Sequence, residues 1–406
     1  MTKNGLDALP ACAVKCLTQT CAWSDVACLC QAAVSDPLES CLLSICSIPQ
    51  GLQSRYIIGN SCQLPVRDHG IKYAVLVFTL GPLAFCSIIL RVLYKQLFSA
   101  RRVMEYDDYT IMCAIPVGLA IVPVVIVGLN SHGLGKDMWG VPQPDLETFG
   151  LFFLITVFLY IILMCLIKLT LCFFYLNIFS GKSIRNLLWA TVAFHVLTSV
   201  IFIMLNLIAF DPISTYWKRY DWTEERSFQQ RCSFIAPGYA NAVTSVVSDF
   251  WLLAIPLSQV QKLKLHWKKK VGVSFMFLTG ACVTVISLLR LKSVHHYENS
   301  TNPTWYEWDL AMWSTLEITI GLTCTSLPTV RLILVHFAPR FFGSTRQLSR
   351  PSVDLPRRPT EPPLCSGHTL QTMARPPSPK PSTPRRDSQV TFGSEEKLRQ
   401  PPELAV

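Results

Sequence analysis

Eight closely spaced cysteines near the start of the chain could form disulfide bonds. Such a set of thiols stays oxidised only where glutathione does not reduce it, so it predicts a small disulfide-rich domain in an oxidising compartment. The spacing does not give the connectivity. The eight residues are Cys12, Cys16, Cys21, Cys28, Cys30, Cys41, Cys46 and Cys62.

Four charged residues, Lys168, Asp249, Arg290 and Glu317, lie inside long apolar stretches. An unpaired ion in hydrocarbon is costly, so such residues are usually paired or functional. A rise of about 1.5 Å per helical residue places the first two in the cytoplasmic half of the membrane and the last two in the outer half. We predict that Lys168 contacts Asp249 and that Arg290 contacts Glu317, either to lock the helices together or to form a signalling switch.

These charges belong to a set of seven stretches, each long enough to cross a membrane. Hydrophobic residues make up 50% of the 406 residues and charged residues only 15%, which is typical of a membrane protein. A helix of about 20 residues spans the hydrocarbon and satisfies its own backbone there. The predicted transmembrane helices are residues 71–93, 109–130, 149–176, 187–210, 236–258, 271–293 and 309–335.

Six more cysteines lie within these stretches. Because a free cysteine behaves as a small hydrophobe, we expect all six to be buried. They are Cys86, Cys113, Cys165, Cys172, Cys282 and Cys324.

Lysine and arginine in the loops predict the orientation of the helices. One set of loops carries Lys95–Arg102, Lys182–Arg185 and Lys262–Lys270, whereas the opposite loops mix charges and contain a glycosylation sequon at Asn299. We therefore expect a multi-pass plasma-membrane protein with an extracellular N-terminus and a cytoplasmic C-terminus. The net charge of +10 fits this topology and contact with membrane lipid, and we do not expect nucleic-acid binding.

Composition divides the chain into three parts. Residues 1–66 hold the clustered cysteines, residues 67–340 hold the apolar helices, and residues 341–406 are rich in Pro, Ser and Arg and are expected to be disordered. Residues 1–11 contain no apolar signal-peptide core, so we expect either a missing upstream segment or transfer of the N-terminus by the first helix. The predicted fold class is all-α: a seven-helix transmembrane bundle with a small helical N-terminal domain and a disordered tail.

The N-terminal cysteine pattern resembles the fungal CFEM domain, an eight-cysteine extracellular helical module. The Pro10–Ala13 opening and the Cys28–Cys30 pair carry the resemblance, while the Cys16–Cys21 gap is shorter than that family usually shows. Some CFEM proteins bind haem through an aspartate just before the paired cysteines, and Asp25 occupies the matching position. The resemblance thus implies haem as a cofactor at Asp25, against the alternative that Asp25 caps a helix.

Residues 65–340 resemble the fungal rhodopsin-like family of integral membrane proteins, described as G-protein-coupled-receptor-like sensors of plant surfaces. The resemblance implies an extracellular ligand and a heterotrimeric G protein or another cytoplasmic transducer as partners. The chain lacks the cysteine that the family places before Pro212-Ile213, which leaves Cys232 without its loop partner. The matching residues are Pro65–Asp68, Tyr106–Tyr109, Gly133–Trp139, Lys168–Thr170, Phe174–Leu176, Asp249, Arg290, Glu317 and Leu327-Pro328.

G-protein coupling itself rests on architecture and family naming alone. The third helix ends in Tyr175–Phe179 without an Asp-Arg-Tyr triplet, and the seventh carries Leu327–Val330 where animal receptors have Asn-Pro-x-x-Tyr. Residues 305–335 contain no lysine, so we do not expect a retinal Schiff base.

We expect a receptor-like protein that senses extracellular or host-surface cues, signals to the cytoplasm and contributes to virulence. Two alternatives stay open: capture of haem or iron by the CFEM domain with the bundle as anchor, and a membrane accessory protein of a secondary-metabolite gene cluster. Enzyme activity is not expected, because no metal-ligand or nucleophile–base spacing is apparent. Asp107-Asp108 lie at a helix start, where the dipole favours acids, and His195, alone on an apolar helix, is expected to pack in the core.

Overall fold

The computed structural model describes most of the first 337 residues, and these are almost entirely helical. The predicted tail, residues 341–406, and the sequon at Asn299 lie outside the described residues. The described ranges are 8–21, 25–32, 36–97, 104–208, 217, 232–262, 267–298 and 302–337.

Four short helices form the N-terminal domain. Leu17, Leu42 and Ile58 are buried in its small core, and all eight clustered cysteines are oxidised in pairs. A core this small depends on covalent links for its stability. The helices are α1 (Ala11–Thr20), α2 (Val26–Ala32), α3 (Asp36–Ile45) and α4 (Ile48–Ser61). The disulfide bonds are Cys12–Cys46, Cys16–Cys41, Cys21–Cys28 and Cys30–Cys62.

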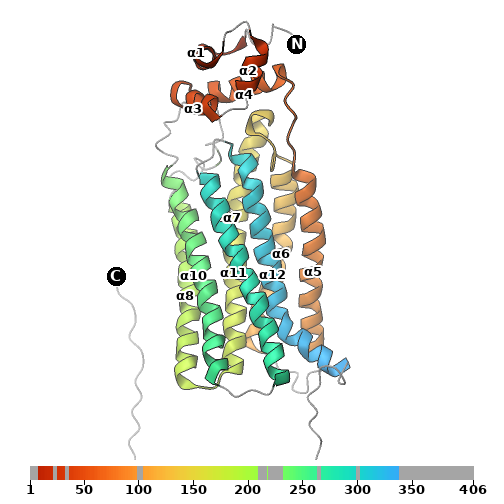
Figure 1. The fold of residues 1–406 in the computed structure, drawn as a ribbon. Coiled ribbons are helices and arrows are strands. Elements are labelled where there is room, and N and C mark those ends of the chain that lie inside the picture. Colours follow the sequence, from red (N-terminus) through yellow and green to blue (C-terminus); the bar gives the residue numbers. More distant parts are fainter. Residues whose placement is uncertain are drawn as a thin grey trace, which may run out of the picture. The chain divides into compact units, whose positions relative to one another are not determined.

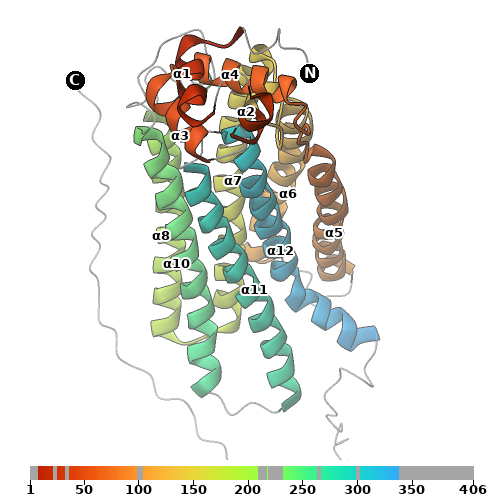
Figure 2. The same cartoon turned by 45° about the horizontal axis from the view of Figure 1, so that its top comes forward.

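Seven long helices follow in the described part of the chain, one for each predicted span (Figure 1). Helix α11 packs against both α10 and α12, and the two views agree on this order (Figures 1 and 2). The helices are α5 (Gly70–Leu97), α6 (Tyr106–Pro123) continued by the π-helix η2 (Val124–Asn130), α7 (Gln143–Ile178), α8 (Lys182–Ile208), α10 (Cys232–Lys262), α11 (Trp267–Glu298) and α12 (Pro303–Phe337).

Six of the seven long helices are apolar enough over their described residues to cross a membrane. Helix α12 is not among the six, and it carries acidic residues and many hydroxyl side chains along its length. The helices run past the predicted boundaries, because α-helical structure continues beyond the hydrocarbon. Helix α11, for example, begins before the predicted span 271–293 and continues beyond it to Glu298.

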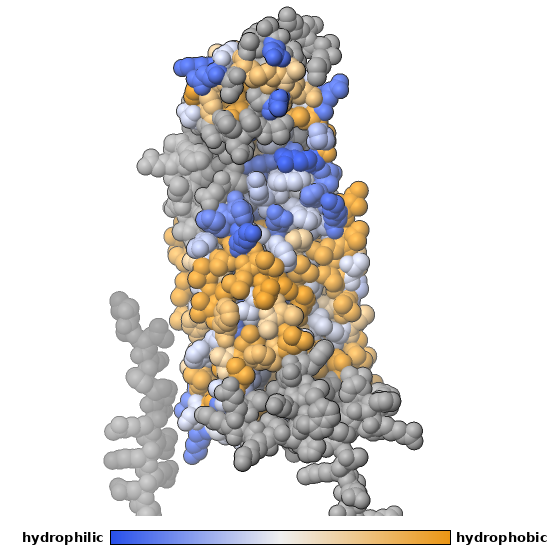
Figure 3. Space-filling view, viewed as in Figure 1, coloured by the Kyte–Doolittle hydropathy of each residue, from blue (hydrophilic) through white to orange (hydrophobic). Residues whose placement is uncertain are grey.

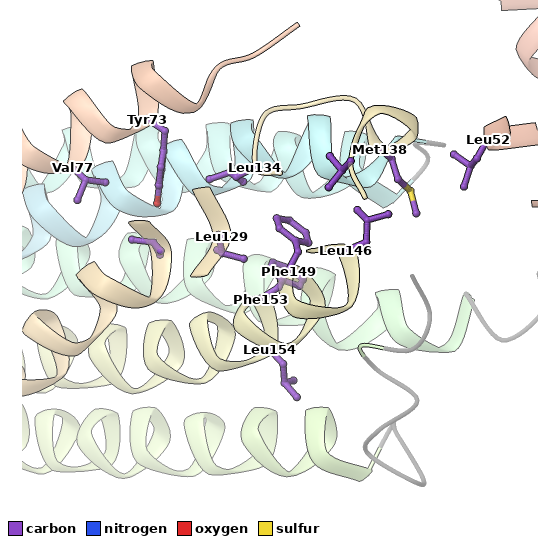
Figure 4. Close-up of a cluster of buried hydrophobic side chains, with 12 residues drawn as sticks. Leu52, Tyr73, Val77, Leu129, Leu134, Met138, Leu146, Phe149, Phe153 and Leu154 are labelled. Atoms are coloured by element: carbon purple, nitrogen blue, oxygen red, sulfur yellow. The ribbon is translucent and has the colours of Figure 1, made fainter. Parts of the chain in front are cut away.

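Helix α7 lies at the centre of the bundle, where it contacts α6, α8, α10 and α12. Its sequence is apolar on all sides, which is typical of a fully surrounded helix. Leu129 of η2 packs with Phe149 and Phe153 of α7 in one buried cluster (Figure 4). A second buried cluster joins Ile111 of α6 to Leu163 of α7. Both clusters hold α6 and α7 in a fixed register.

Apolar side chains gather in a band across the middle of the bundle, with hydrophilic side chains above it (Figure 3). The expectation that all six bundle cysteines are buried was wrong: Cys86, Cys113 and Cys282 are exposed, whereas Cys172 and Cys324 are buried. Lipid tails are as apolar as a protein core, so apolar sequence alone does not distinguish the two environments.

Gly128 allows η2 to approach α7 closely. A Cβ atom at this position would lie 2.3 Å from Cγ of Phe152, well inside van der Waals contact. The Phe152 side chain is itself packed against the buried cluster around Leu129. The site therefore leaves no room for any residue larger than glycine.

We predict that Gly128→Ala destabilises the bundle by about 1–3 kcal/mol, because the added methyl group must displace the Phe152 ring. Gly118→Ala is the matched control in the preceding helix, since a Cβ there meets nothing within 4 Å. Thermal unfolding in lipid nanodiscs measures both. Equal unfolding temperatures for the two variants would contradict the prediction.

Candidate functional site

Lys168 of α7 is buried in the bundle against α10. Its Nζ lies 3.0 Å from Oδ1 of Asp249 and donates hydrogen bonds to the Ser245 hydroxyl at 2.9 Å and the Ser248 hydroxyl at 3.3 Å. Both charged side chains are only 7% exposed. A buried ammonium needs this many oxygen partners to offset the loss of water. The structure thus brings together the first of the two expected pairs.

Arg290 of α11 reaches Glu317 of α12 mainly through a tyrosine. Its Nη1 donates to the Tyr160 hydroxyl at 2.5 Å, and that hydroxyl donates to Oε2 of Glu317 at 2.8 Å. The direct distance between Arg290 Nη1 and Glu317 Oε2 is 3.5 Å. The guanidinium also lies over the Tyr160 ring, 4.1 Å from its centroid. The second expected pair is therefore present, with Tyr160 as a member that the sequence analysis missed.

Ser287 joins the two pairs into one network. Its Oγ lies 2.6 Å from Oδ2 of Asp249 and 2.8 Å from Oε1 of Glu317. The Ser245 hydroxyl also donates to Oε1 of Glu317, at 3.3 Å. The two pairs were expected to be separate contacts in opposite halves of the membrane, whereas the structure connects them across α7, α10, α11 and α12. Two positive and two negative side chains meet in this central network, so its formal charge is zero.

A second buried cluster lies where α5, α6 and α12 meet. The Arg91 guanidinium, 1% exposed, forms ion pairs with Asp107 and Asp108 and donates to the backbone carbonyl of Thr325. Lys95 adds a contact to Asp108 at 2.8 Å. The interpretation of the two aspartates as acids at a helix start was incomplete, because both are buried ion-pair partners. The missed signal was Arg91, a charge inside the first apolar stretch.

Asn177 connects this cluster to the central helix α7. Its Nδ2 donates to Oδ1 of Asp107 at 3.1 Å and to Oε2 of Glu105 at 3.0 Å. Glu105 also caps α6 together with Asp108 in a reciprocal capping box. The cluster therefore joins four helices at one end of the bundle, and three of its charges are acidic.

A third polar cluster lies at the other end of the bundle, beside the loop after η2. Gly133 and Gly135 adopt φ angles of 118° and 75°, which favour glycine, and they turn the chain towards the start of α12. Asp137 then accepts hydrogen bonds from Asn302 at 2.7 Å and from Arg67 Nε at 3.1 Å. This cluster fixes the loop against α12 without a disulfide bond.

Asp25 caps a helix in the N-terminal domain. Its Oδ1 accepts a hydrogen bond from the backbone N–H of Cys28 at 3.1 Å, at the first turn of α2. The side chain is exposed. Among the described residues, no group of three His, Cys, Asp or Glu side chains is arranged to hold a metal ion. The structure thus gives Asp25 a structural role and leaves its second oxygen open to solvent.

His195 packs inside the bundle, where the sequence analysis expected it. Its ring is buried, and its backbone carbonyl accepts a contact from Cys165 Sγ at 3.7 Å. Its Nε2 has no hydrogen-bond partner among the described residues. Cys232 begins α10, and its side chain lies outside the described part of the structure.

Comparison with known proteins identifies both parts of the chain. Residues 90–336 match the fungal rhodopsin domain, which is more than half of the 406 residues. The chain belongs to the fungal rhodopsin domain family. Residues 5–63 match the CFEM domain, so the disulfide-bonded helices α1–α4 form a CFEM domain at the N-terminus of a fungal rhodopsin domain protein. No solved structure matches the chain.

Three curated relatives are similar to this fungal rhodopsin domain protein. Receptor GIN3 of Arthrobotrys oligospora is 25% identical over 49% of this chain and 46% of its own length. A SAT4 family membrane protein of Emericella nidulans is 26% identical over 55% of each chain. The polyenoic acids biosynthesis gene cluster protein Ba17b of Metarhizium anisopliae is 22% identical over 65% of this chain and 74% of its own. The chain thus spans about half the length of the first two, and the comparisons support a receptor-like membrane protein.

We predict that Lys168→Met and Asp249→Leu each destabilise the bundle by about 3–5 kcal/mol, because each leaves one buried charge unpaired. The double variant should recover part of this loss, because it removes both ions. Thermal unfolding in nanodiscs measures the three variants. Arg67→Met is the control: its side chain is 46% exposed and should cost about 1 kcal/mol or less. Strict additivity of the two single effects would contradict the pairing.

Proposed function

We propose that this protein is a plasma-membrane receptor that senses an extracellular cue and signals to a cytoplasmic transducer. The observation that carries the proposal is the position of Ser287 between two carboxylates. A serine hydroxyl has one proton and can donate it to only one acceptor at a time. The Ser287 hydroxyl has one acceptor in its own helix, the Val283 carbonyl at 3.1 Å. Its two nearer acceptors lie on other helices, Asp249 of α10 and Glu317 of α12, and the proton can bond only one of them at a time.

Two hydrogen-bond arrangements of comparable geometry give the bundle an element that a ligand can bias. A ligand shifts such an equilibrium by its difference in affinity for the two states. The arrangement that bonds Asp249 strengthens the contact between α10 and α11, and the other strengthens the contact between α11 and α12. A cue that moves α12 relative to α10 would therefore be transmitted through Ser287.

The orientation of the protein completes the receptor proposal. We propose that the CFEM domain faces the cell exterior, and its disulfide bonds support this because disulfides persist in oxidising environments. The basic segment Lys262–Lys270 then faces the cytoplasm, where it meets anionic lipid or a transducer. Seven crossings would place the sequon at Asn299 outside and the C-terminal tail inside. Support for a signalling role also comes from the name of the relative Receptor GIN3.

Co-purification from fungal membranes tests this proposal. We expect the full chain to retain a Gα subunit that GTP analogues release, and we expect Ser287→Ala to change that retention about fivefold, the effect of one buried hydrogen bond. Ser293→Ala is the matched control, because within the described helices its hydroxyl bonds only to Leu289 of its own helix. Neutralising Lys268, Lys269 and Lys270 should abolish retention. Absence of any nucleotide-sensitive Gα, or equal behaviour of the two serine variants, would overturn the receptor proposal.

Haem capture by the CFEM domain is the second candidate function. The exposed Asp25 carboxylate uses one oxygen as a helix cap and would leave the other to hold a ferric haem, which a carboxylate suits chemically. Bound haem would be the source of iron for uptake. The bundle would then serve as the membrane anchor.

A pair of substitutions at Asp25 separates the cap from the ligand. Asp25→Asn keeps a side-chain oxygen for the Cys28 N–H and loses the charge, whereas Asp25→Ala loses both. If haem binds through this carboxylate, the haem absorption shift seen with the full chain in nanodiscs should vanish in both variants, while thermal stability falls only in Asp25→Ala. A shift that survives Asp25→Asn would exclude the carboxylate as ligand.

A third candidate is an accessory role in a secondary-metabolite gene cluster. The names of two relatives support it, the polyenoic acids cluster protein of Metarhizium anisopliae and the fugralins cluster protein 2 of Gibberella zeae. Each name describes the relative alone. We propose no enzyme activity for this chain, because the buried charges of the central network and of the Arg91 cluster are engaged in ion pairs with one another.

A further inference from the structure

A groove lies between α8 and α10, within the part of each helix that is apolar enough to span a membrane. The two helices run side by side (Figure 1). Small side chains at Ala190 and Ala254 leave space between them, and the groove has a volume of about 510 Å³. Small-molecule sites commonly have volumes in the range of roughly 300–1,000 Å³. Its walls are mostly apolar and include Phe194, Phe250 and Trp251.

The polar groups of the groove accept hydrogen bonds but have no proton left to donate. The Thr191 hydroxyl donates to the carbonyl of Leu187 at 2.9 Å, and the Trp251 indole N–H donates to Thr191 at 3.1 Å. The Ser248 hydroxyl donates to the carbonyl of Thr244. Each hydroxyl oxygen has two lone pairs. Thr191 uses one of them to accept from Trp251, and Ser248 uses one to accept from Lys168, so each oxygen keeps one lone pair.

These donors and acceptors determine which polar group a molecule bound in the groove can have. A carbonyl or ether group would find no donor in the groove, whereas a hydroxyl group would find an acceptor at Thr191 or Ser248. The exposed walls face the lipid side of the bundle, since Phe194, Val247 and Trp251 are all about half exposed, at 45%, 61% and 46%. A molecule that reaches them must therefore be dissolved in the membrane.

We propose that the groove between α8 and α10 binds one membrane-dissolved molecule with an apolar body and a hydroxyl group that donates to Thr191 or Ser248. Ser248 also accepts a hydrogen bond from Lys168, so the occupant would lie one hydroxyl group away from the central network. Binding there does not depend on whether the protein signals. Bulk lipid chains and a second copy of this chain are the competing occupants.

Photo-labelling of the full chain in nanodiscs tests the site. The probes are a long-chain alcohol that carries a diazirine and an alkyne, and its methyl ether, which cannot donate a hydrogen bond. We expect the alcohol to label residues 187–194 and 247–254 about fivefold more than the ether does, the effect of one hydrogen bond. Thr191→Val should remove much of this preference without removing the groove.

Substitutions that fill the groove with a larger side chain test whether labelling depends on the shape of the groove. Ala254→Phe and Ala190→Phe should each suppress labelling by the alcohol, whereas Ala193→Phe, on an exposed position of α8 outside the groove, should not. Thermal unfolding confirms that the variants used are folded. Equal labelling by alcohol and ether would show that bulk lipid chains fill the groove, and cross-linking of α8 to α10 of a second copy would show a dimer contact. Either result would overturn the proposal.

Discussion

Neutralisation of buried charge is the constraint on which the bundle depends. Lys168, Asp249, Arg290 and Glu317 come from four different helices, and none could remain buried as an ion without the others. Their mutual contacts therefore fix how α7, α10, α11 and α12 are placed around the centre. Apolar packing around Leu163 fills the space between the helices, but lipid would satisfy those side chains almost as well.

The central network and the Arg91 cluster use different chemistry for the same task. In the central network, Lys168 contacts Asp249 directly, whereas the Tyr160 and Ser287 hydroxyl groups bridge the other charged side chains. In the Arg91 cluster, Asp107 and Asp108 contact the guanidinium directly and leave it less freedom. The helices are thus held by direct ion pairs at this end of the bundle, and by ion pairs together with hydroxyl bridges at its centre.

The sequence predicted the class of fold well because the cost of burying backbone and charge in lipid leaves few solutions. Seven apolar stretches became seven helices, and the lone charges within them became ion pairs. The sequence did not predict the disulfide connectivity, since it depends on how four short helices pack. It also gave no sign that Ser287 would bridge two carboxylates, because a serine in an apolar stretch reads as a neutral residue. The buried ion pairs of Asp107 and Asp108 were not predicted, because the helix dipole alone explains two acidic residues at the start of a helix.

The disulfide between Cys30 and Cys62 determines how the CFEM domain would respond to a mechanical load. Cys62 directly follows α4 and is the last cysteine before the chain continues to α5. A pull on that linker is therefore carried by the sulfur bridge to α2 and does not unwind α4 first. Because Cys28 on the same helix is bonded to Cys21, the load is shared with the preceding segment. A load on the linker would thus act on the helix that Asp25 caps.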